Sequence, residues 1–271
     1  MPEGWLSGGD EAQVLNCGHW VLHLSPSWRT PEELSWCHQV AQQVKQHIPE
    51  AVAPLHPHHG DDSFFLWRGY RVTVFPRVVG THLNSTVSPL RQQAATLLSA
   101  LHRLDSQSFT PRPVNIQAPR PVKDIPDTFQ DPELDKQWQQ ALESGLSTGL
   151  CHGDYYQANL LCHEQKLVGI IDWHEAHVGT FLLELAGACF EMCHLPDGEL
   201  DPQRARDFVA AYRLQSPISS REYALLPLAL RVWLRQDALN CMAWGDLFTC
   251  DYVQQHVRAF HRLRNFSPGS I

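Results

Sequence analysis

Lysine is scarce in this sequence. Only four of the 21 basic residues are lysines, at positions 45, 123, 136 and 166, and the formal net charge is −8. A protein that binds nucleic acid through its phosphates needs a basic face, so this charge argues against such a partner. The charge instead fits a ligand that is neutral, cationic or bound together with a metal ion.

Long apolar runs and paired cysteine motifs are also missing. No apolar run reaches the length of about 18 residues that a membrane span requires. The first residues lack the basic and apolar regions of a secretory signal peptide. We therefore expect a cytoplasmic protein with no membrane partner. The eight cysteines include no CxxC pair, which argues against a thiolate zinc site and favours reduced, mostly buried thiols.

The 271 residues are 43% apolar, enough for one large domain or two smaller lobes. Residues 1–80 contain short strand-like runs and one amphipathic helix, in the order strand, strand, helix, strand, strand. The helix is expected to start after Thr30, whose side chain can cap it. Residues 81–271 are mainly helical in pattern, with a short β segment near residues 150–171. The sequence thus predicts strands and helices in two unequal parts.

Three polar residues stand out in the β segment: Asp154, Asn159 five residues later, and Asp172. The apolar runs at 160–161 and 167–171 predict buried hairpin strands that bring Asp172 back beside Asn159. A carboxylate and an amide oxygen at one strand end suit a hard cation such as Mg²⁺. The separate carboxylate of Asp154 could orient a hydroxyl nucleophile. These are the parts that a phosphoryl-transfer site requires.

The motifs in this segment also resemble those of a known family. His-Gly-Asp at 152–154, Asn159 and Ile-Asp-Trp at 171–173 resemble the aminoglycoside phosphotransferase, choline kinase and type II homoserine kinase superfamily, which has a protein-kinase-like fold. The resemblance implies an α+β, bilobal structure. A small β-rich lobe with one helix would cover residues 1–80 and bind nucleotide. A larger, mainly helical lobe over residues 81–271 would carry the catalytic and substrate sites.

The resemblance assigns roles to four residues. Asp154 falls on the catalytic aspartate, and His152 on the histidine that supports the catalytic loop. Asn159 and Asp172 fall on the metal ligands. The implied reaction is Mg²⁺-dependent transfer of the γ-phosphoryl group of ATP or GTP to the hydroxyl of a small molecule. The acidic balance beyond residue 80 favours an amino-bearing acceptor; the sequence carries no signal for the oligomeric state.

Nucleotide binding is where the sequence departs from the family pattern. Gly8 and Gly9 resemble the glycine-rich turn over the nucleotide phosphates, and the backbone from Phe75 to Val78 would meet the base. The strand position that carries a phosphate-binding Lys or Arg in the family falls on His23. A neutral imidazole is a weaker phosphate anchor than a fixed charge. This substitution leaves open an alternative function as a nucleotide-binding or inactive pseudokinase-type module.

Further residues support weaker interpretations. Arg29 is a second candidate for the phosphate contact, and Glu33 is interpreted as a charge at the helix start. His174 and His177 leave a third hypothesis, a metal-dependent hydrolase, although their spacing is not that of the HExxH zinc motif. The acceptor pocket is expected among the later helices, with candidates Glu191, Asp197, Asp237, Asn240 and Trp244.

Overall fold

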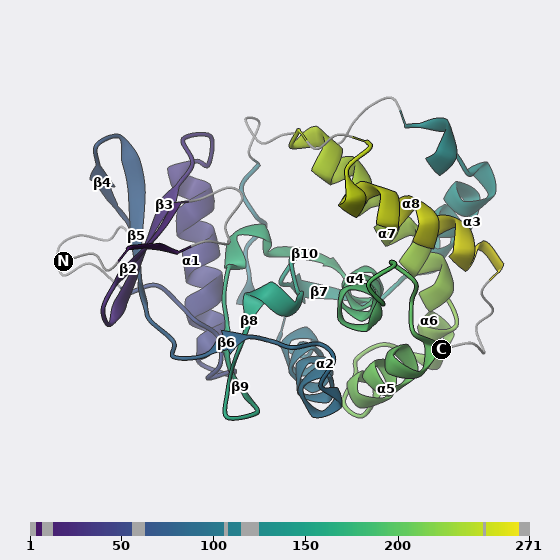
Figure 1. The fold of residues 1–271 in the computed structure, drawn as a ribbon, viewed down its shortest axis with the longest axis horizontal. Coiled ribbons are helices and arrows are strands. Elements are labelled where there is room, and N and C mark those ends of the chain that lie inside the picture. Colours follow the sequence, from purple (N-terminus) through teal and green to yellow (C-terminus); the bar gives the residue numbers. More distant parts are fainter. Residues whose placement is uncertain are drawn as a thin grey trace.

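The computed structural model describes residues 4–6, 13–55, 63–105, 108–114, 125–245 and 248–265. Two parts are visible in Figure 1: a β-sheet with helix α1 beside it at the N-terminal end, and a larger, mainly helical part beyond it. This arrangement confirms the expected α+β, bilobal fold. The predicted phosphate turn at Gly8 and Gly9 lies outside the described residues.

The N-terminal lobe is built on a five-stranded antiparallel sheet with the order β1-β2-β3-β5-β4. Arg68 and Gly69 connect the last two strands and both have positive φ, as a two-residue type I′ turn requires. The sheet contains one short strand, β1, that the sequence patterns did not predict. Its strands are β1 (Gly4–Leu6), β2 (Gln13–Cys17), β3 (Trp20–Ser25), β4 (Phe65–Trp67) and β5 (Tyr70–Pro76).

Helix α1 (Pro31–Lys45) starts where the sequence predicted. The hydroxyl of Thr30 accepts a 3.2 Å hydrogen bond from the backbone N–H of Glu33, and Pro31 occupies the first turn. The apolar face of the helix is fully buried, with Leu34 and Val44 having no exposed surface. In Figure 1, α1 stands between the N-terminal sheet and the rest of the molecule.

Two small sheets lie between the N-terminal sheet and the C-terminal helices (Figure 1). One has the strand order β6-β8-β9, and the other pairs β10 with β7. The β8–β9 hairpin was predicted, whereas the partner strands β6 and β10 were not. Their bounds are β6 (Thr81–His82), β7 (Thr148–Cys151), β8 (Leu160–His163), β9 (Lys166–Ile170) and β10 (His177–Thr180).

The C-terminal lobe is mainly helical and is organised around α4. This helix is apolar on almost all sides and packs against α5 and α7. Gly187 permits close packing, since a Cβ there would lie 2.4 Å from Trp233 Nε1. The helices are α2 (Ser88–His102), α3 (Pro132–Glu143), α4 (Phe181–Cys193), α5 (Pro202–Arg213), α6 (Ser220–Tyr223), α7 (Leu226–Ala243) and α8 (Asp251–Arg262). Short 3₁₀ turns are η2 (Asp127–Phe129), η3 (Gln157–Asn159), η4 (Trp173–Glu175) and η5 (Leu263–Asn265).

The cysteines behave as the sequence predicted. All eight are free thiols. Five of them are buried, at positions 37, 151, 162, 189 and 193. Within the described ranges, no helix combines the length and apolar character that crossing a membrane would require.

Candidate active site

The His-Gly-Asp motif forms a tight loop after β7. Gly153 has φ = +83°, and a Cβ at this position would lie 2.0 Å from the carbonyl oxygen of Glu175. Only glycine therefore fits here. His152 is fully buried; its Nε2 donates to the carbonyl oxygen of Ile171 at 3.0 Å, and its Nδ1 accepts from the N–H of Asp154 at 3.3 Å. Burial lowers the pKa of His152, so its neutral ring braces the loop.

Asp154 is held in place by Asn159, at the end of η3. The amide Nδ2 of Asn159 donates to Asp154 Oδ2 at 2.7 Å and to its carbonyl oxygen at 2.9 Å. These bonds leave the amide oxygen of Asn159 as an acceptor for another partner. Burial and the nearby charge of Asp172 raise the pKa of Asp154 to about 8, although the hydrogen bond from Asn159 opposes the shift.

The β8–β9 hairpin places Asp172 beside Asn159, as its apolar runs predicted. Leu160 pairs with Ile170, and the N–H of Ile171 donates to the carbonyl oxygen of Asn159 at 2.9 Å. Asp172 follows directly, in a left-handed conformation with φ = 62°. Such a conformation is uncommon outside glycine and is frequent at functional sites.

The side chain of His174 forms a hydrogen bond with the carboxylate of Asp172. His174 Nδ1 lies 2.7 Å from Asp172 Oδ1. Burial alone would raise the pKa of Asp172, but the hydrogen bond and charge of His174 outweigh it and hold the pKa well below its usual range. Asp172 is therefore an ionised carboxylate, one residue after the backbone hydrogen bond that joins Ile171 to Asn159. Carboxylate and amide oxygens fit a hard divalent cation such as Mg²⁺.

The N-terminal lobe contributes His23 to the same region. His23 lies on β3 opposite Thr73 of β5, and its ring stacks on that of His174 with centroids 4.6 Å apart. Burial, followed by the charge of His174, lowers the pKa of His23 to about 3. Phe75 of β5 lies edge-on to the His23 ring at 6.2 Å. Val78 is half-buried in the segment after β5.

Arg29 has a different role from the phosphate contact that the sequence suggested. Its buried guanidinium donates to Glu33 Oε1 at 3.2 Å, to the carbonyl oxygen of His174 at 2.9 Å and to Glu175 Oε1 at 2.7 Å. Arg112 also contacts the Glu33 carboxylate. Glu33 is thus a buried ion-pair partner rather than a simple charge at the helix start. Together these residues tie α1 to the segment that follows Asp172.

A buried carboxylate of α4, that of Glu184, also contacts the loop that carries Asp154. Glu184 of α4 accepts a 2.6 Å hydrogen bond from the N–H of Gly153. Its second oxygen lies 2.6 Å from His102 Nε2, and His102 Nδ1 lies 2.5 Å from the hydroxyl of Tyr212. The sequence signal for these hydrogen-bonded residues is weak: Glu184 is one of two acidic residues in an otherwise apolar helix.

Two of the predicted acceptor residues, Glu191 and Asp237, contact the same hydroxyl group. Asp237 of α7 is close enough for its charge to raise the pKa of Asp154. The hydroxyl of Tyr252 lies 2.9 Å from Asp237 Oδ2 and 3.2 Å from Glu191 Oε1. Burial and Asp237 raise the pKa of Glu191. Acidic groups from α4 and α7 therefore surround one phenol group.

The other acceptor candidates do not join this group. Asp197 lies in an exposed turn, where it pairs with Arg262 at 3.8 Å. Asn240 is exposed on α7. Trp244, just beyond α7, packs against Trp28 of the N-terminal lobe with ring centroids 4.9 Å apart. Within the part of the chain that the structure describes, Glu191 and Asp237 are the two of these five candidates that share a direct partner, the hydroxyl of Tyr252.

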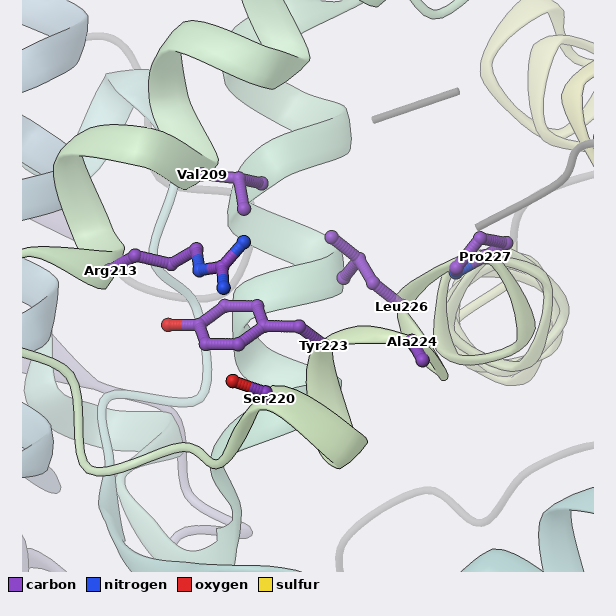
Figure 2. Close-up of a pocket in the computed structure, with 7 residues that line it drawn as sticks. All are labelled: Val209, Arg213, Ser220, Tyr223, Ala224, Leu226 and Pro227. Atoms are coloured by element: carbon purple, nitrogen blue, oxygen red, sulfur yellow. The ribbon is translucent and has the colours of Figure 1, made fainter. Parts of the chain in front are cut away.

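A pocket in the C-terminal lobe lies among α5, α6 and α7 (Figure 2). Its volume is about 200 Å³, and the guanidinium of Arg213 stacks over the ring of Tyr223 at 4.5 Å. None of the predicted site residues lines it, so it is separate from the candidate active site. Its lining consists of Val209, Arg213, Ser220, Tyr223, Ala224, Leu226 and Pro227.

The chain is similar to kinases of small molecules. It is 28% identical over 206 residues to homoserine kinase of Pseudomonas aeruginosa, an alignment that covers 69% of this chain and 65% of that protein. The chain thus spans slightly under two thirds of the length of this relative. It is 32% identical over 118 residues to homoserine kinase of Methylobacillus glycogenes, covering 41% of this chain and 37% of that protein.

Solved structures show the same fold at low identity. An amicoumacin kinase in complex with AMP-PNP, Ca²⁺ and Ami has a TM-score of 0.73 and 12% identity, covering 99% of this chain and 90% of the other. A choline kinase of Streptococcus pneumoniae has a TM-score of 0.63 and 13% identity, covering 97% of this chain and 95% of the other. The family model described as "Phosphotransferase enzyme family" matches residues 8–217. Because this match covers well over half of the sequence, the chain belongs to the phosphotransferase enzyme family.

Proposed function

We propose that this protein is a small-molecule kinase that transfers the γ-phosphoryl group of ATP or GTP to a substrate hydroxyl with Mg²⁺. The observation that carries the proposal is the convergence of Asp154, Asn159 and Asp172. Asn159 donates to Asp154 at 2.7 Å, and the hairpin sets Asp172 beside Asn159. Family membership supports the reaction class. The amicoumacin kinase complex with AMP-PNP and Ca²⁺ supports a nucleotide and a divalent cation.

Asp154 orients the acceptor hydroxyl and accepts its proton. Burial raises the pKa of Asp154 above the usual range of a carboxyl, which makes its ionised form a stronger base than an ordinary carboxylate. His152 keeps the loop in shape through its bonds to Ile171 and Asp154. Asn159 and Asp172 would hold the cation, whose charge stabilises the negative charge on the transferred phosphoryl group.

The nucleotide is proposed to lie between the lobes, which we divide near residue 80. The five-stranded sheet ends at Pro76, and β6 at 81–82 already pairs with β8 of the other lobe, which supports this division. His23 faces the candidate metal site, where a neutral imidazole offers one N–H to a phosphate oxygen. The contacts to the nucleotide base are assigned to the backbone from Phe75 to Val78.

The acceptor is proposed to carry an amino group. Glu191 and Asp237 approach one hydroxyl, that of Tyr252, and the charge of Asp237 reaches Asp154. An ammonium group placed here would offset the repulsion between the two carboxylates. The free thiols of the chain are consistent with a reducing compartment such as the cytoplasm.

Two measurements on the purified protein test the proposal. Thermal shifts with ATP and GTP, each with and without Mg²⁺, test nucleotide binding, and we expect a metal-dependent shift. A screen of amino alcohols, aminoglycosides and non-amino alcohols, coupled to ADP or GDP release, tests transfer. Release that depends on an amino-bearing alcohol supports the kinase. Binding without release for any acceptor would favour the pseudokinase-type alternative, and no shift with either nucleotide would contradict both.

A further inference from the structure

The two carboxylate oxygens of Asp172 have different surroundings. Its Oδ1 accepts hydrogen bonds from His174, at 2.7 Å from the ring Nδ1 and at 3.4 Å from the backbone N–H. Its Oδ2 has no hydrogen-bond partner among the residues that the structure describes, and 45% of the side chain is exposed. One oxygen is therefore fixed by His174, and the other is available to a ligand.

The backbone at Asp172 depends on support from its surroundings. Asp172 has φ = 62° and ψ = 71°, the left-handed conformation. A residue other than glycine keeps this conformation only where the surrounding contacts enforce it. Within the described ranges, His174 is the residue whose hydrogen bonds hold the side chain of Asp172. The orientation of this carboxylate therefore depends on the position of His174.

The N-terminal lobe in turn fixes His174, which lies on η4 of the other lobe. The ring of His174 stacks on that of His23 from β3, with centroids 4.6 Å apart and planes inclined by 19°. The ring of His38 from α1 lies edge-on to it at 6.1 Å. The carbonyl oxygen of His174 accepts from the guanidinium of Arg29 at 2.9 Å and lies 3.6 Å from the thiol of Cys37.

The ring of His174 has few other contacts that could hold it. Its Nε2 has no hydrogen-bond partner in the part of the chain that the structure describes. A carboxylate only accepts hydrogen bonds, so Nδ1 carries the hydrogen in the contact with Asp172. The face of the ring thus packs on the N-terminal lobe, while one edge donates to Asp172.

These contacts form a continuous connection from one lobe to a candidate metal ligand. Carboxylates that bind metals are commonly oriented by a hydrogen bond from a residue that does not touch the metal. We propose that His174 is a positioning residue through which the N-terminal lobe orients the carboxylate of Asp172 toward a divalent cation. The inference rests on the proposed kinase function, which supplies the cation and the nucleotide.

Two substitutions separate the donor of His174 from its ring. His174→Phe keeps a ring against His23 and removes the donor, whereas His174→Asn keeps a donor on a shorter side chain. Mn²⁺ is titrated with saturating ADP or GDP, whichever gives the larger thermal shift, and free Mn²⁺ is measured by electron paramagnetic resonance. We expect His174→Phe to bind Mn²⁺ about 10- to 100-fold more weakly than wild type, and His174→Asn to bind at least about fivefold more tightly than His174→Phe. Equal affinity in wild type and His174→Phe, or in the two variants, would overturn the proposal.

Substitutions of His23 test the stack. His23→Phe and His23→Ala both remove the ring nitrogens, but only the first keeps a ring to pack against His174. A difference between them therefore reports the stack and not a contact of His23 with the nucleotide. We expect His23→Ala to bind Mn²⁺ at least about threefold more weakly than His23→Phe. Equal affinities would contradict a contribution of the N-terminal lobe through this ring.

A neighbouring histidine provides the matched control. His177 is exposed, lies three residues from His174 and bonds through Nδ1 to the carbonyl oxygen of Glu175. His177→Phe should keep the wild-type affinity for Mn²⁺, and a loss as large as that of His174→Phe would contradict a specific role of His174. The circular dichroism and melting temperature of each variant establish that it is folded.

The metal dependence of turnover separates a positioning role from a general loss of activity. With an acceptor identified by the screen, His174→Phe should raise the Mg²⁺ concentration for half-maximal rate about 10- to 100-fold, while kcat at saturating Mg²⁺ stays within about threefold. A lower kcat with unchanged Mg²⁺ dependence would overturn the proposal and leave the kinase function intact. Weaker Mn²⁺ binding in His174→Phe, with no turnover of any acceptor by wild type, would instead contradict the kinase function alone.

A measurement on the unmodified protein is independent of how the variants fold. Proton–nitrogen NMR correlation of protein with labelled histidine shows which ring nitrogen carries hydrogen. The signals of His174 are identified by their absence from the spectrum of His174→Asn. We expect a hydrogen on Nδ1. A ring with its hydrogen on Nε2 alone would overturn the proposal, because it cannot donate to Asp172 through Nδ1.

Discussion

The backbone N–H of Gly153 donates a 2.6 Å hydrogen bond to Glu184 Oε1, so a buried carboxylate of α4 holds the loop that carries Asp154. The other oxygen of Glu184 lies 2.6 Å from His102 Nε2. The pKa of Glu184 lies below its usual range because hydrogen bonds and charge from His102 outweigh the effect of burial. Helices α2, α4 and α5 are thereby connected to the loop that carries Asp154 through Tyr212, His102 and Glu184.

Tyr212→Phe tests the outer end of this chain. The change removes the hydroxyl partner of His102 Nδ1 while keeping the ring, and it leaves a buried nitrogen unsatisfied. We expect the free energy of unfolding to fall by about 1–3 kcal/mol in urea denaturation. Tyr70→Phe is the matched control, because Tyr70 is exposed, and it should stay within about 0.5 kcal/mol of wild type. Equal effects of the two changes would show that the Tyr212 hydroxyl contributes nothing specific.

Gly153→Ala tests the geometry of the loop that carries Asp154. Its Cβ would collide with the carbonyl oxygen of Glu175 at 2.0 Å, so the loop has to move. Gly145 also has a positive φ, +77°, but has open space around its Cβ position. Gly145→Ala should therefore cost about 1–2 kcal/mol from conformation alone and leave turnover unchanged. Gly153→Ala should cost more and lower turnover at least 10-fold; identical behaviour of the two variants would refute the close contact.

Asp172→Asn tests the electrostatic coupling between the two aspartates. The negative charge of Asp172 disfavours ionisation of Asp154, so its removal should lower the pKa of Asp154 below about 8. Carbon NMR of labelled carboxyl groups in protein without metal or nucleotide measures this pKa. Asp207→Asn, which changes an aspartate of α5 outside the site, should leave it unchanged. An unaltered titration of Asp154 in Asp172→Asn would contradict the coupling.

Asp131→Asn tests a structural ion pair through pH. Burial opposes ionisation of Asp131, but bonds from Arg231 and Arg264 at 2.6 and 3.1 Å and from the N–H of Leu134 lower its pKa to about 2. A depressed folded-state pKa contributes stability that is present above the ordinary value of 3.8 and is lost as pH falls toward 2.

The difference in the free energy of unfolding between wild type and Asp131→Asn, called the gap below, should therefore be largest at pH 7. It should shrink as pH falls below about 4. Asparagine still caps α3, so the comparison isolates the charge. Urea denaturation across this pH range measures the gap. Asp127→Asn, at an exposed position, should show no comparable gap. A gap that is the same at pH 7 and pH 3 would exclude the ion pairs as its source.

Local patterns predicted the elements whose causes are local. The cap at Thr30 and the apolar period of α1 lie within one segment, and both appear in the structure. The apolar runs of β8 and β9 are close in sequence, so the position of Asp172 beside Asn159 could also be predicted. Strand β10, in contrast, pairs with β7, which lies more than 20 residues earlier in the chain. The residues of β10 show no apolar alternation that would predict a strand.

Contacts between distant segments could not be predicted from the sequence patterns. Arg29 contacts the backbone of His174 and the carboxylate of Glu175, 145 and 146 residues away. Sequence spacing showed only that Arg29 and Glu33 are four residues apart, which does not distinguish a surface pair from a buried one. The stack of His23 on His174 likewise joins two lobes and is set by their packing. Such contacts depend on tertiary structure and not on local periodicity.

The most direct test of the account is turnover and nucleotide binding of Asp154→Asn, measured on the same preparation with an acceptor identified by the screen. The amide keeps the shape of the side chain and removes the proton acceptor. We predict that the Kd for the Mg²⁺–nucleotide complex stays within about threefold of wild type while kcat falls by about 10²–10⁴-fold. Turnover equal to that of wild type in Asp154→Asn would contradict the assignment of Asp154 as the catalytic residue.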